Sequence, residues 1–494
     1  MSGDAPLRAD YVIVGAGSAG CVMANRLSED PDVSVCLLEA GGHDRSLTIR
    51  MPAALGVNTA GGRHNWGFQT TPQTHLDNRS IYTPRGKGLG GSSSINGLVF
   101  VRGHANDYDR WETEGATGWN FQNVLPYFKK LENWHGPASD HRGTSGPVHV
   151  TTRPADNPLD RAFLAAGPQA GYATTDDING RTQEGFGYFD TNIHNGERQR
   201  ASAAYLHPVT PRTNLSVKTN AAVTRVLFEG ERAVGVEFVS GGRTYELRAN
   251  REVILCAGAI KTPQLLMLSG VGDPKHLAEH NIPVIHDLPG VGQNLQDHLE
   301  IHLHYKAPAT AALNREMLPH RLAKNLTQWF MSRTGPATSN GCTVGAFLKT
   351  DDKATHPDAQ IHFFPVYLQG WIPKPRPHGF RLGIGTLRAT SVGTIKLNDG
   401  NPASSPKIDP NYLATEQDRT DLRRCVEMAR EIVAQAAFDG VRFEELDPGQ
   451  SVQTSQDIDA YIRKEAGTAY HVSSRAGWVQ MILLLRTRIP ECVA

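Results

Sequence analysis

Glycines near the start of the chain have the spacing of a dinucleotide-binding finger. The segment 15–20 reads Gly-Ala-Gly-Ser-Ala-Gly, directly after an apolar run. Gly15 can adopt backbone angles that a side chain forbids, Gly17 lets a pyrophosphate approach, and Gly20 lets the following helix pack close to the sheet. Glu39 ends the next apolar run, where a carboxylate can accept hydrogen bonds from a ribose diol. Without these flanking features, the same glycines would also fit a turn in an unrelated α/β protein.

Two further glycine-rich segments have the residue types to contact a cofactor. In the segment 86–96, glycines precede three serines and Asn96, which leaves little side-chain bulk and many backbone donors. Such a loop would lie well against a flat ring or a phosphate, and it would equally suit a flexible linker. The segment 258–272 ends a strand and begins a helix with its apolar residues on one face. By residue types alone, ordinary helix packing is the favoured interpretation there.

The elements that position these segments predict an α/β fold. The start of the chain reads as strand, helix and strand, the opening βαβ unit of a parallel sheet. The spacing of apolar residues predicts helices over 107–113 and 121–132. Residues 213–257 alternate short β-rich runs with turn residues, which predicts a β-meander that returns to the main sheet. From about residue 300 onward, helical and extended runs predict a second unit that covers the cofactor.

The composition excludes several classes of protein. Lys plus Arg and Asp plus Glu both total 50 in 494 residues, so the surplus of basic charge needed by a nucleic-acid binder is missing. No apolar stretch is long enough to span a bilayer and the first residues do not read as a signal peptide, which predicts a cytoplasmic protein without a transmembrane segment. The six cysteines have no C-x-x-C spacing, so neither a metal site nor a disulfide framework is expected.

Four separated motifs together resemble those of the glucose-methanol-choline (GMC) oxidoreductases. They are the finger, the loop 86–96, the segment 258–272, and the segment 289–298, which reads Pro-Gly-Val-Gly-Gln-Asn-Leu-Gln-Asp-His. The resemblance runs from about residue 9 to 471 and is closest to choline dehydrogenase-like and sorbose dehydrogenase-like members. It implies an FAD-dependent alcohol dehydrogenase that forms an aldehyde or ketone by hydride transfer to flavin N5.

The fold implied by this resemblance is an FAD-binding doubly wound parallel sheet with a β-meander, plus an α+β substrate-binding cap domain. The FAD-binding domain would be discontinuous, with residues 9–155 and 213–300. The substrate-binding domain would take residues 156–212 and 301–465, and residues 472–494 would form an aberrant tail.

Carried over to this sequence, the family's motifs assign residues to each part of the cofactor. The finger would hold the pyrophosphate, Glu39 the adenosine ribose, the second loop the flavin side, and the backbone of Val223 the adenine. In covalent relatives, a His one residue before the Asn of the second loop bonds to the flavin. Ile95 stands there in this chain, so noncovalent FAD is expected. The cofactor residues implied are Gly15, Gly17, Ser18, Gly20, Glu39, Gly90, Gly91, Ser92, Asn96 and Val223.

His471 matches the start of the segment that carries the family's catalytic base. An alcohol proton is too weakly acidic to leave unaided, and an imidazole can accept it near neutral pH. Choline-specific relatives place a Glu in the substrate lid, and alignment of the segment 339–347 puts Thr343 there, so choline is not the first expectation for the substrate. His362 is expected either to reach the pocket or to be a core histidine bonded to the backbone.

After His471 the sequence departs from the family's pattern. The segment 472–494 has none of the family's closing motif, whereas a shift of reading frame over 474–483 permits Thr-Cys-Arg-Met-Gly-Ala-Asp-Asp-Pro, which a member should have there. A frameshift just after His471 is therefore expected, with a naturally divergent tail as the alternative. In relatives this part carries a second catalytic His or Asn and the last strand and helix of the FAD domain. The chain as given is therefore expected to bind FAD poorly and to turn over little.

Several activities stay open at this point. Electrons are expected to pass from a small-molecule alcohol to a quinone, a dye-like acceptor or a respiratory carrier, with an oxidase that produces hydrogen peroxide as the main alternative. An inactive flavin-binding remnant, a hydroxynitrile lyase on the same scaffold and an NAD-dependent enzyme are the others.

Overall fold

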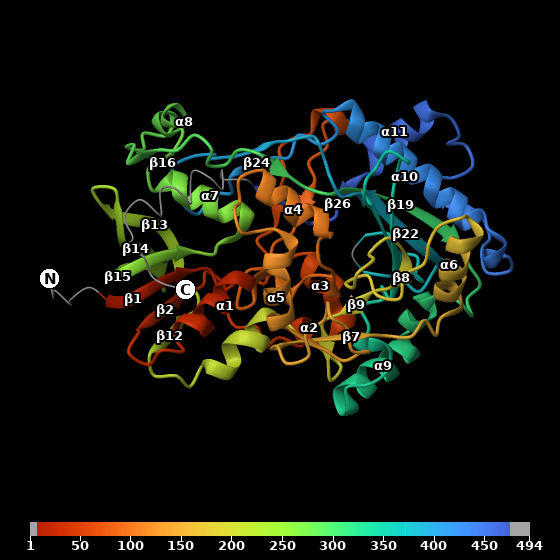
Figure 1. Ribbon diagram of the computed structural model, residues 1–494, viewed down its shortest axis with the longest axis horizontal. Coiled ribbons are helices and arrows are strands. Elements are labelled where there is room, and N and C mark those ends of the chain that lie inside the picture. The colour runs from red at the N-terminus through yellow and green to blue at the C-terminus, as the bar shows by residue number, and fades with distance from the viewer. Residues whose placement is uncertain (1–6, 371, 475–494) are drawn as a thin grey trace.

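Two large β-sheets dominate the computed structural model of the protein, which describes residues 7–370 and 372–474 (Figure 1). The first sheet has six strands in the order β12-β2-β1-β15-β14-β13. Their bounds are Leu215–Lys218 for β12, Val35–Leu38 for β2, Leu7–Val14 for β1, Arg243–Leu255 for β15, Arg232–Ser240 for β14 and Ala222–Glu229 for β13.

The centre of this sheet is parallel and its edge is a meander. β1 pairs in parallel with both β2 and β15, and β12 pairs in parallel with β2. β13, β14 and β15 follow one another in antiparallel pairs. The predicted parallel sheet with a β-meander is therefore confirmed.

Burial on both faces explains why the strands of this sheet read as apolar runs. Every residue of β2 is buried. Ile13 packs on one side of the sheet with α1 (Ser18–Leu27), and Val12 and Val14 pack on the other side with Leu265 of α7 (Gly258–Leu268). The helix predicted to begin near residue 258 is confirmed by α7.

The second sheet has seven strands and carries the larger apolar core. Its order is β25-β19-β22-β21-β20-β8, and β26 pairs with β19. Neighbouring strands on this path are antiparallel. The bounds are Glu445–Asp447 for β25, Leu299–Lys306 for β19, Gly379–Thr386 for β22, Ala359–Phe364 for β21, Val344–Leu348 for β20, Gly185–Tyr188 for β8 and Gly467–Thr468 for β26.

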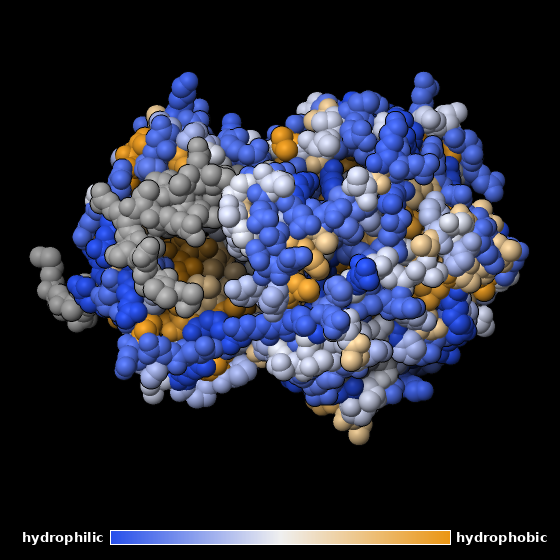
Figure 2. All heavy atoms as spheres, viewed as in Figure 1, coloured by the Kyte–Doolittle hydropathy of each residue, from blue (hydrophilic) through white to orange (hydrophobic). Residues whose placement is uncertain are grey.

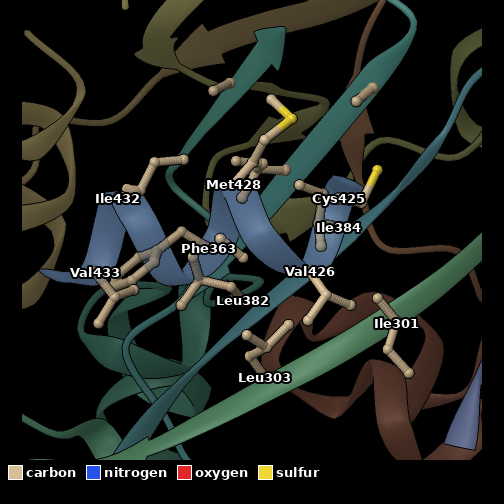
Figure 3. Packing of buried hydrophobic residues seen from close by; sticks show 14 of the residues in the cluster. Ile301, Leu303, Phe363, Leu382, Ile384, Cys425, Val426, Met428, Ile432 and Val433 are labelled. Atoms are coloured by element: carbon tan, nitrogen blue, oxygen red, sulfur yellow. The ribbon is translucent and has the colours of Figure 1, made fainter. Parts of the chain in front are cut away.

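Alternation along these strands gives the second sheet an apolar face and a polar face. Ile301 and Leu303 of β19 and Phe363 of β21 point to the apolar face, where α10 (Glu416–Ala434) lies across them (Figure 3). Thr415 is the N-cap of α10, its side chain accepts the Asp418 N–H, and the first turn of the helix is acidic as the helix dipole favours. α6 (Pro158–Gln169) packs on the same core.

Shorter elements connect and cover the two sheets. α4 (Ala105–Thr113) and α5 (Phe121–Leu131) confirm the two helices predicted from apolar spacing. The other α-helices of the described residues are α2 (Leu47–Arg50), α3 (Leu55–Thr59), α8 (Pro274–Glu279), α9 (Pro319–Ser332) and α11 (Ser455–Glu465). A four-stranded sheet contains β5 (Val99–Phe100), β9 (Asp190–Thr191), β7 (Val148–Thr152) and β6 (Glu132–Trp134).

Five two-stranded ladders complete the strand pairings of the described residues. They are β10 (Ile193–His194) with β11 (Glu197–Arg198), β16 (Val271–Gly272) with β17 (His286–Asp287), β18 (Leu295–Gln296) with β27 (Ser473–Ser474), β23 (Thr394–Lys396) with β24 (Lys407–Asp409), and β3 (Phe68–Gln69) with β4 (Tyr82–Thr83). β27 lies near the start of the tail expected over 472–494. From residue 475 onward, this tail lies outside the described residues.

Hydrophilic residues cover much of the face seen in Figure 2, and hydrophobic residues gather in a hollow in the area of β1 and α1. Partly buried hydrophobic residues pack against the core at this end of the first sheet, among them Tyr11, Val22, Met23 and Ile254. Among the described residues, no helix combines the length and the apolar character needed to cross a bilayer.

Candidate active site

β1 passes into α1 through a turn with no room for side chains at two positions. Gly15 has a φ of +97°, and a Cβ on it would lie 2.6 Å from the carbonyl oxygen of Cys256. A Cβ on Gly20 would lie 1.9 Å from the carbonyl oxygen of Gly15. Glycine is therefore required at both positions, as the finger predicts.

The N-terminus of α1 is arranged to receive an anion. Gly17 is the N-cap, no side chain caps the helix, and its first turn holds no acidic residue. A Cβ on Gly17 would meet only the Cys256 oxygen, at 3.9 Å, and Ser18 is exposed. The first N–H groups of a helix have no partner within it, and the helix dipole is positive at this end. The turn therefore fits a pyrophosphate.

Glu39 ties three segments together at the end of β2. Its buried carboxylate accepts the N–H groups of Ala16 at 2.9 Å, Gly41 at 2.7 Å and Gly88 at 2.9 Å. Burial raises the pKa of Glu39, and these N–H bonds offset only part of that rise. A carboxylate offers about four lone-pair sites. One site is thus left on Oε2, which suits a ribose hydroxyl.

The second glycine-rich loop lies directly against the finger. The Gly90 N–H donates to the Ala16 carbonyl at 2.8 Å, and a Cβ on Gly91 would lie 2.7 Å from the Cα of Gly17. Ser92 and Asn96 are exposed in this loop. Because backbone packs on backbone, the loop is an ordered partner of the finger and not a flexible linker. We call residues 15–20 and 86–96 the glycine cradle.

The predicted adenine contact Val223 and the residue Ile95, which replaces the His of covalent relatives, both have clear places near the finger. Val223 lies in β13, two residues after Ala221, whose N–H donates to the Glu39 carbonyl at 2.9 Å. Ile95 is 3 % exposed, so its side chain points into the interior of the chain. The cradle, the uncapped helix and the remaining site on Glu39 together fit the ADP half of FAD.

His471 lies beside a second histidine, although the two are 173 residues apart in the sequence. The Nδ1 atoms of His471 and His298 are 3.1 Å apart, and the two rings are perpendicular. β26 and β19 bring them together, with the Ala469 N–H donating to the His298 carbonyl at 2.8 Å. Tyr470, just before His471, has a φ of +69°, a left-handed conformation that side chains rarely adopt.

Asp297 holds the backbone of both histidines. Its Oδ1 accepts the N–H groups of His298 and His471, each at 2.9 Å. Its Oδ2 accepts the hydroxyls of Tyr412, at 2.5 Å, and Thr468. Burial raises the pKa of Asp297. With four donors on its two oxygens, Asp297 is a fixed support for the segment that ends at His471.

The surroundings keep the His471 imidazole neutral. Its side chain is accessible to solvent, yet desolvation by the surrounding chain and the neighbouring His298 and His362 lower its pKa to about 3. Burial also lowers the pKa of His298. A neutral imidazole is the form that can accept a proton.

A buried carboxylate stands next to these histidines on the polar face of the second sheet. Glu300 Oε1 lies 2.8 Å from His302 Nε2, and its Oε2 lies 3.8 Å from His362 Nδ1. Burial acts to raise the pKa of Glu300, but His302, His362 and Arg381 outweigh it and lower the pKa to about 2. The carboxylate is therefore ionised at neutral pH. We call Asp297, His298, Glu300, His302, His362 and His471 the base cluster.

Strand register explains how the base cluster assembles. His302 of β19 and His362 of β21 both pair with Gly383 of β22, which lies between them. A Cβ on Gly383 would lie 3.2 Å from the His302 ring and 3.4 Å from Glu300 Oε2. A glycine at this point leaves room for two imidazoles and one carboxylate on the same face.

Thr343 has a different environment from the one expected. Its hydroxyl donates to Asp160 of α6 at 2.7 Å, and its carbonyl accepts the Phe189 N–H. The carboxylate beside His302 and His362 is Glu300, which lies two residues after the segment 289–298 and which the sequence-based reasoning missed. Its signal was the alternation of Glu300, His302 and His304 along β19. His362, left open between two interpretations, lies in the base cluster.

Comparison with known proteins gives one family. A family model described as GMC oxidoreductase matches residues 9–300 at its N-terminal part and 389–477 at its C-terminal part. The mitochondrial choline dehydrogenase of Mus musculus is 46 % identical over 471 residues, which cover 94 % of this chain and 79 % of the relative. The oxygen-dependent choline dehydrogenase of Brucella ovis is 45 % identical over 467 residues, covering 94 % and 85 %.

Solved structures agree with this result. Pyridoxine 4-oxidase from Mesorbium loti superposes with a TM-score of 0.84 at 29 % identity, covering 94 % of this chain and 88 % of that one. An FAD-dependent oxidoreductase from Chaetomium thermophilum superposes with a TM-score of 0.84 at 26 % identity, covering 94 % and 89 %.

Proposed function

Since the chain belongs to the GMC oxidoreductase family and is an FAD-dependent oxidoreductase of CH–OH groups, we propose that it oxidises a cationic alcohol of the choline class. One observation carries this choice of substrate: the ionised, buried carboxylate of Glu300 in the base cluster. A cation leaves water at a high cost unless an anion receives it. The choline dehydrogenases at 45 % and 46 % identity support the same substrate class.

The glycine cradle is the proposed holder of FAD. The start of α1 binds the pyrophosphate, Glu39 binds the ribose, and the backbone beside Val223 receives the adenine. The flavin side lies along Gly90, Gly91, Ser92 and Asn96. Bound FAD supplies the acceptor for the two electrons that leave the substrate carbon. Because Ile95 offers no atom for a covalent bond and points inward, the cofactor is held noncovalently.

His471 is the proposed base, and its environment selects the atom that receives the proton. In the proposed arrangement, His298 Nδ1 is the acceptor of the bond between the two Nδ1 atoms. His471 then donates from Nδ1 to His298, and its Nε2 carries the free lone pair. The alcohol proton passes to that Nε2 as the C–H bond breaks. Asp297 acts on this step by positioning the backbone of His471.

The test compares choline with its neutral analogue 3,3-dimethylbutan-1-ol, on the purified flavoprotein and its Glu300→Gln variant. We expect choline to reduce the flavin anaerobically, and the variant to lose about 30-fold or more in kcat/KM for choline, the loss expected when one partner of a buried charge pair is removed. The neutral analogue should react equally with both proteins. Glu427→Gln, at an exposed position of α10, is the control.

Two results would contradict the proposal. If neutral alcohols bleach the flavin and choline does not, the cationic substrate class is wrong. If no alcohol bleaches it, the proposed reaction is wrong for this chain, which is the result expected of an inactive flavin-binding remnant.

The proposed final electron acceptor is a quinone, a dye-like acceptor or a respiratory carrier. An oxidase is the second candidate, favoured by the description of the Brucella ovis relative as oxygen-dependent. Hydrogen peroxide formed in step with choline consumption would favour the oxidase, and dye reduction in air without peroxide would favour the dehydrogenase.

A further inference from the structure

Three histidines from separate segments meet outside the active site. His135 follows β6, His149 lies in β7, and His194 ends β10. His135 Nε2 is 2.8 Å from His149 Nδ1, and the rings of His149 and His194 stack in parallel with their centroids 3.7 Å apart. One ring nitrogen from each lies within 4.8 Å of the other two. We call this group the triple-histidine cluster.

The backbone holds all three histidines in place before any ligand arrives. The His135 N–H donates to the Val150 carbonyl at 3.1 Å, and His149 pairs with Asn133 in the β6–β7 ladder. The Thr151 hydroxyl donates to the Ile193 carbonyl at 3.2 Å, which fixes β10 against β7. The strand register therefore brings the backbone of the three histidines together.

We propose that the triple-histidine cluster binds a divalent transition-metal ion of the zinc class. Zinc binds histidine nitrogen at about 2.0–2.1 Å, so two ligands of a tetrahedral site lie roughly 3.4 Å apart. The one spacing of 2.8 Å is shorter than this value and the other nitrogens lie within 4.8 Å, so the rings must turn about their side-chain bonds to direct their lone pairs at one ion. Imidazole is a ligand suited to zinc, nickel and copper, and unsuited to magnesium or calcium.

Exposure agrees with a site that is open on one side. His135 is exposed, whereas His149 and His194 are half-buried. Neutral imidazole is the metal-binding form. Three protein ligands leave a fourth position for water or another small ligand.

A second group of metal-type residues in the described chain lacks this arrangement. His276, Glu279 and His280 also lie within 4.8 Å of one another. However, His276 Nε2 accepts the Leu397 N–H at 3.0 Å, and its Nδ1 lies 3.1 Å from Glu279. Both nitrogens of that ring are engaged within the chain. This group is therefore a suitable control.

A metal ion at the triple-histidine cluster would join three strands. It would link the end of β6 to β7 and β10. β10 continues through a tight turn into β11, whose buried Arg198 donates to the carbonyl and the side chain of Asn96 in the glycine cradle. The proposed metal therefore has a structural role, with no part in the reaction. The expectation of no metal site considered only cysteine spacing.

Zinc binding to the untagged, metal-stripped flavoprotein tests the proposal. We expect about one equivalent of Zn²⁺ per chain by equilibrium dialysis, and weakening of more than about tenfold in His149→Gln and His194→Gln, since even indirect support of a metal ligand has effects of that size. Zinc should also raise the midpoint of thermal unfolding of the parent protein but not of the variants. His280→Gln, in the control group, should bind zinc as the parent does.

The proposal also predicts a spectroscopic signature. Co²⁺ in place of Zn²⁺ should give the visible bands of a four-coordinate ion in the parent protein and lose them in His149→Gln. Flavin content of the variants shows that they are folded. Zinc affinity that is equal in the parent and the His149→Gln/His194→Gln double variant would overturn the proposal, as would loss of zinc binding in His280→Gln alone.

Discussion

The glycine cradle and the base cluster differ in the material from which they are built. The cradle consists of backbone from two short segments, 15–20 and 86–96, packed so closely that a single Cβ would collide with it. The base cluster consists of side chains from segments as far apart as His298 and His471, joined through strand pairing. A site built from backbone requires residues without side chains. A site built from side chains requires the correct pairing register of the strands that carry them.

This difference separates binding from chemistry. The cradle offers N–H groups and a helix dipole, which recognise phosphate and hydroxyl groups but have no proton to exchange near neutral pH. The base cluster offers imidazoles and carboxylates, whose charges depend on their neighbours. Substitutions in the cradle should therefore reduce cofactor content, and substitutions in the base cluster should reduce turnover at full cofactor content.

The largest effect is expected from His471→Asn. Loss of the proton acceptor should lower kcat by about 10²- to 10⁴-fold, the range for general-base catalysis. Flavin content should not change, because the cradle is untouched. Flavin absorbance per chain and stopped-flow flavin reduction measure the two quantities. His320→Asn, at an exposed position of α9, is the matched control.

Two outcomes would contradict the assignment of cofactor binding to the glycine cradle and of catalysis to the base cluster. Activity within tenfold of the parent would mean that His471 is not the base. Loss of flavin together with activity would mean that the base cluster supports the cofactor as much as the reaction.

The second effect in size is expected from Gly20→Ala. The new Cβ would lie 1.9 Å from the Gly15 carbonyl oxygen, so the turn between β1 and α1 must shift. Overpacking of this kind costs about 1–3 kcal/mol of stability, and the shift moves the N–H groups away from the pyrophosphate. Flavin content should fall, and the flavin that stays bound should be reduced by substrate at the parent's rate.

A matched glycine separates this collision from helix and loop propensity. Gly400→Ala places a Cβ 3.8 Å from the nearest atom, the His280 carbonyl oxygen, which is an ordinary contact. It should keep both flavin and stability. Equal flavin content in Gly20→Ala and Gly400→Ala would show that the cradle tolerates side chains. Lack of space would then not be the reason why glycine occupies these positions.

The cradle was readable from the sequence because its residues are consecutive. A Cβ on Gly20 would meet the Gly15 carbonyl of the same turn, a Cβ on Gly91 would meet Gly17 across the cradle, and the flanking apolar runs identify β1 and β2 directly. The parallel sheet and the meander followed from the same local signals. What could not be read was that Glu39 also bonds to Gly88 of the second loop.

The base cluster was only partly readable, for a physical reason. His471 was found through its family position, but Glu300 was missed because its neighbours His302 and His362 reach it through the register of three antiparallel strands. Register is a property of pairing and not of any one strand. The same limit applies to the triple-histidine cluster, whose members come from three strands or strand ends.

The smallest effect is expected from Thr343→Val. This variant tests whether Thr343 contacts the substrate, as its alignment with the lid Glu of choline-specific relatives suggests, or only supports Asp160, as its hydrogen bond indicates. Thr343 donates to Asp160, whose pKa burial raises to about 6, so the folded state holds a proton there that the unfolded state releases at a lower pH. Stability contributed by this group therefore falls as pH rises between about 4 and 6. Without the hydroxyl, the ionised carboxylate loses a donor. Unfolding should cost about 1–3 kcal/mol less at pH 7, and the loss should shrink at pH 5. Thermal midpoints at the two pH values measure this loss of stability.

KM for choline should stay within about twofold of the parent value, since Glu300 is untouched. A tenfold rise in KM would show that Thr343 contacts the substrate and would weaken the proposed role of Glu300.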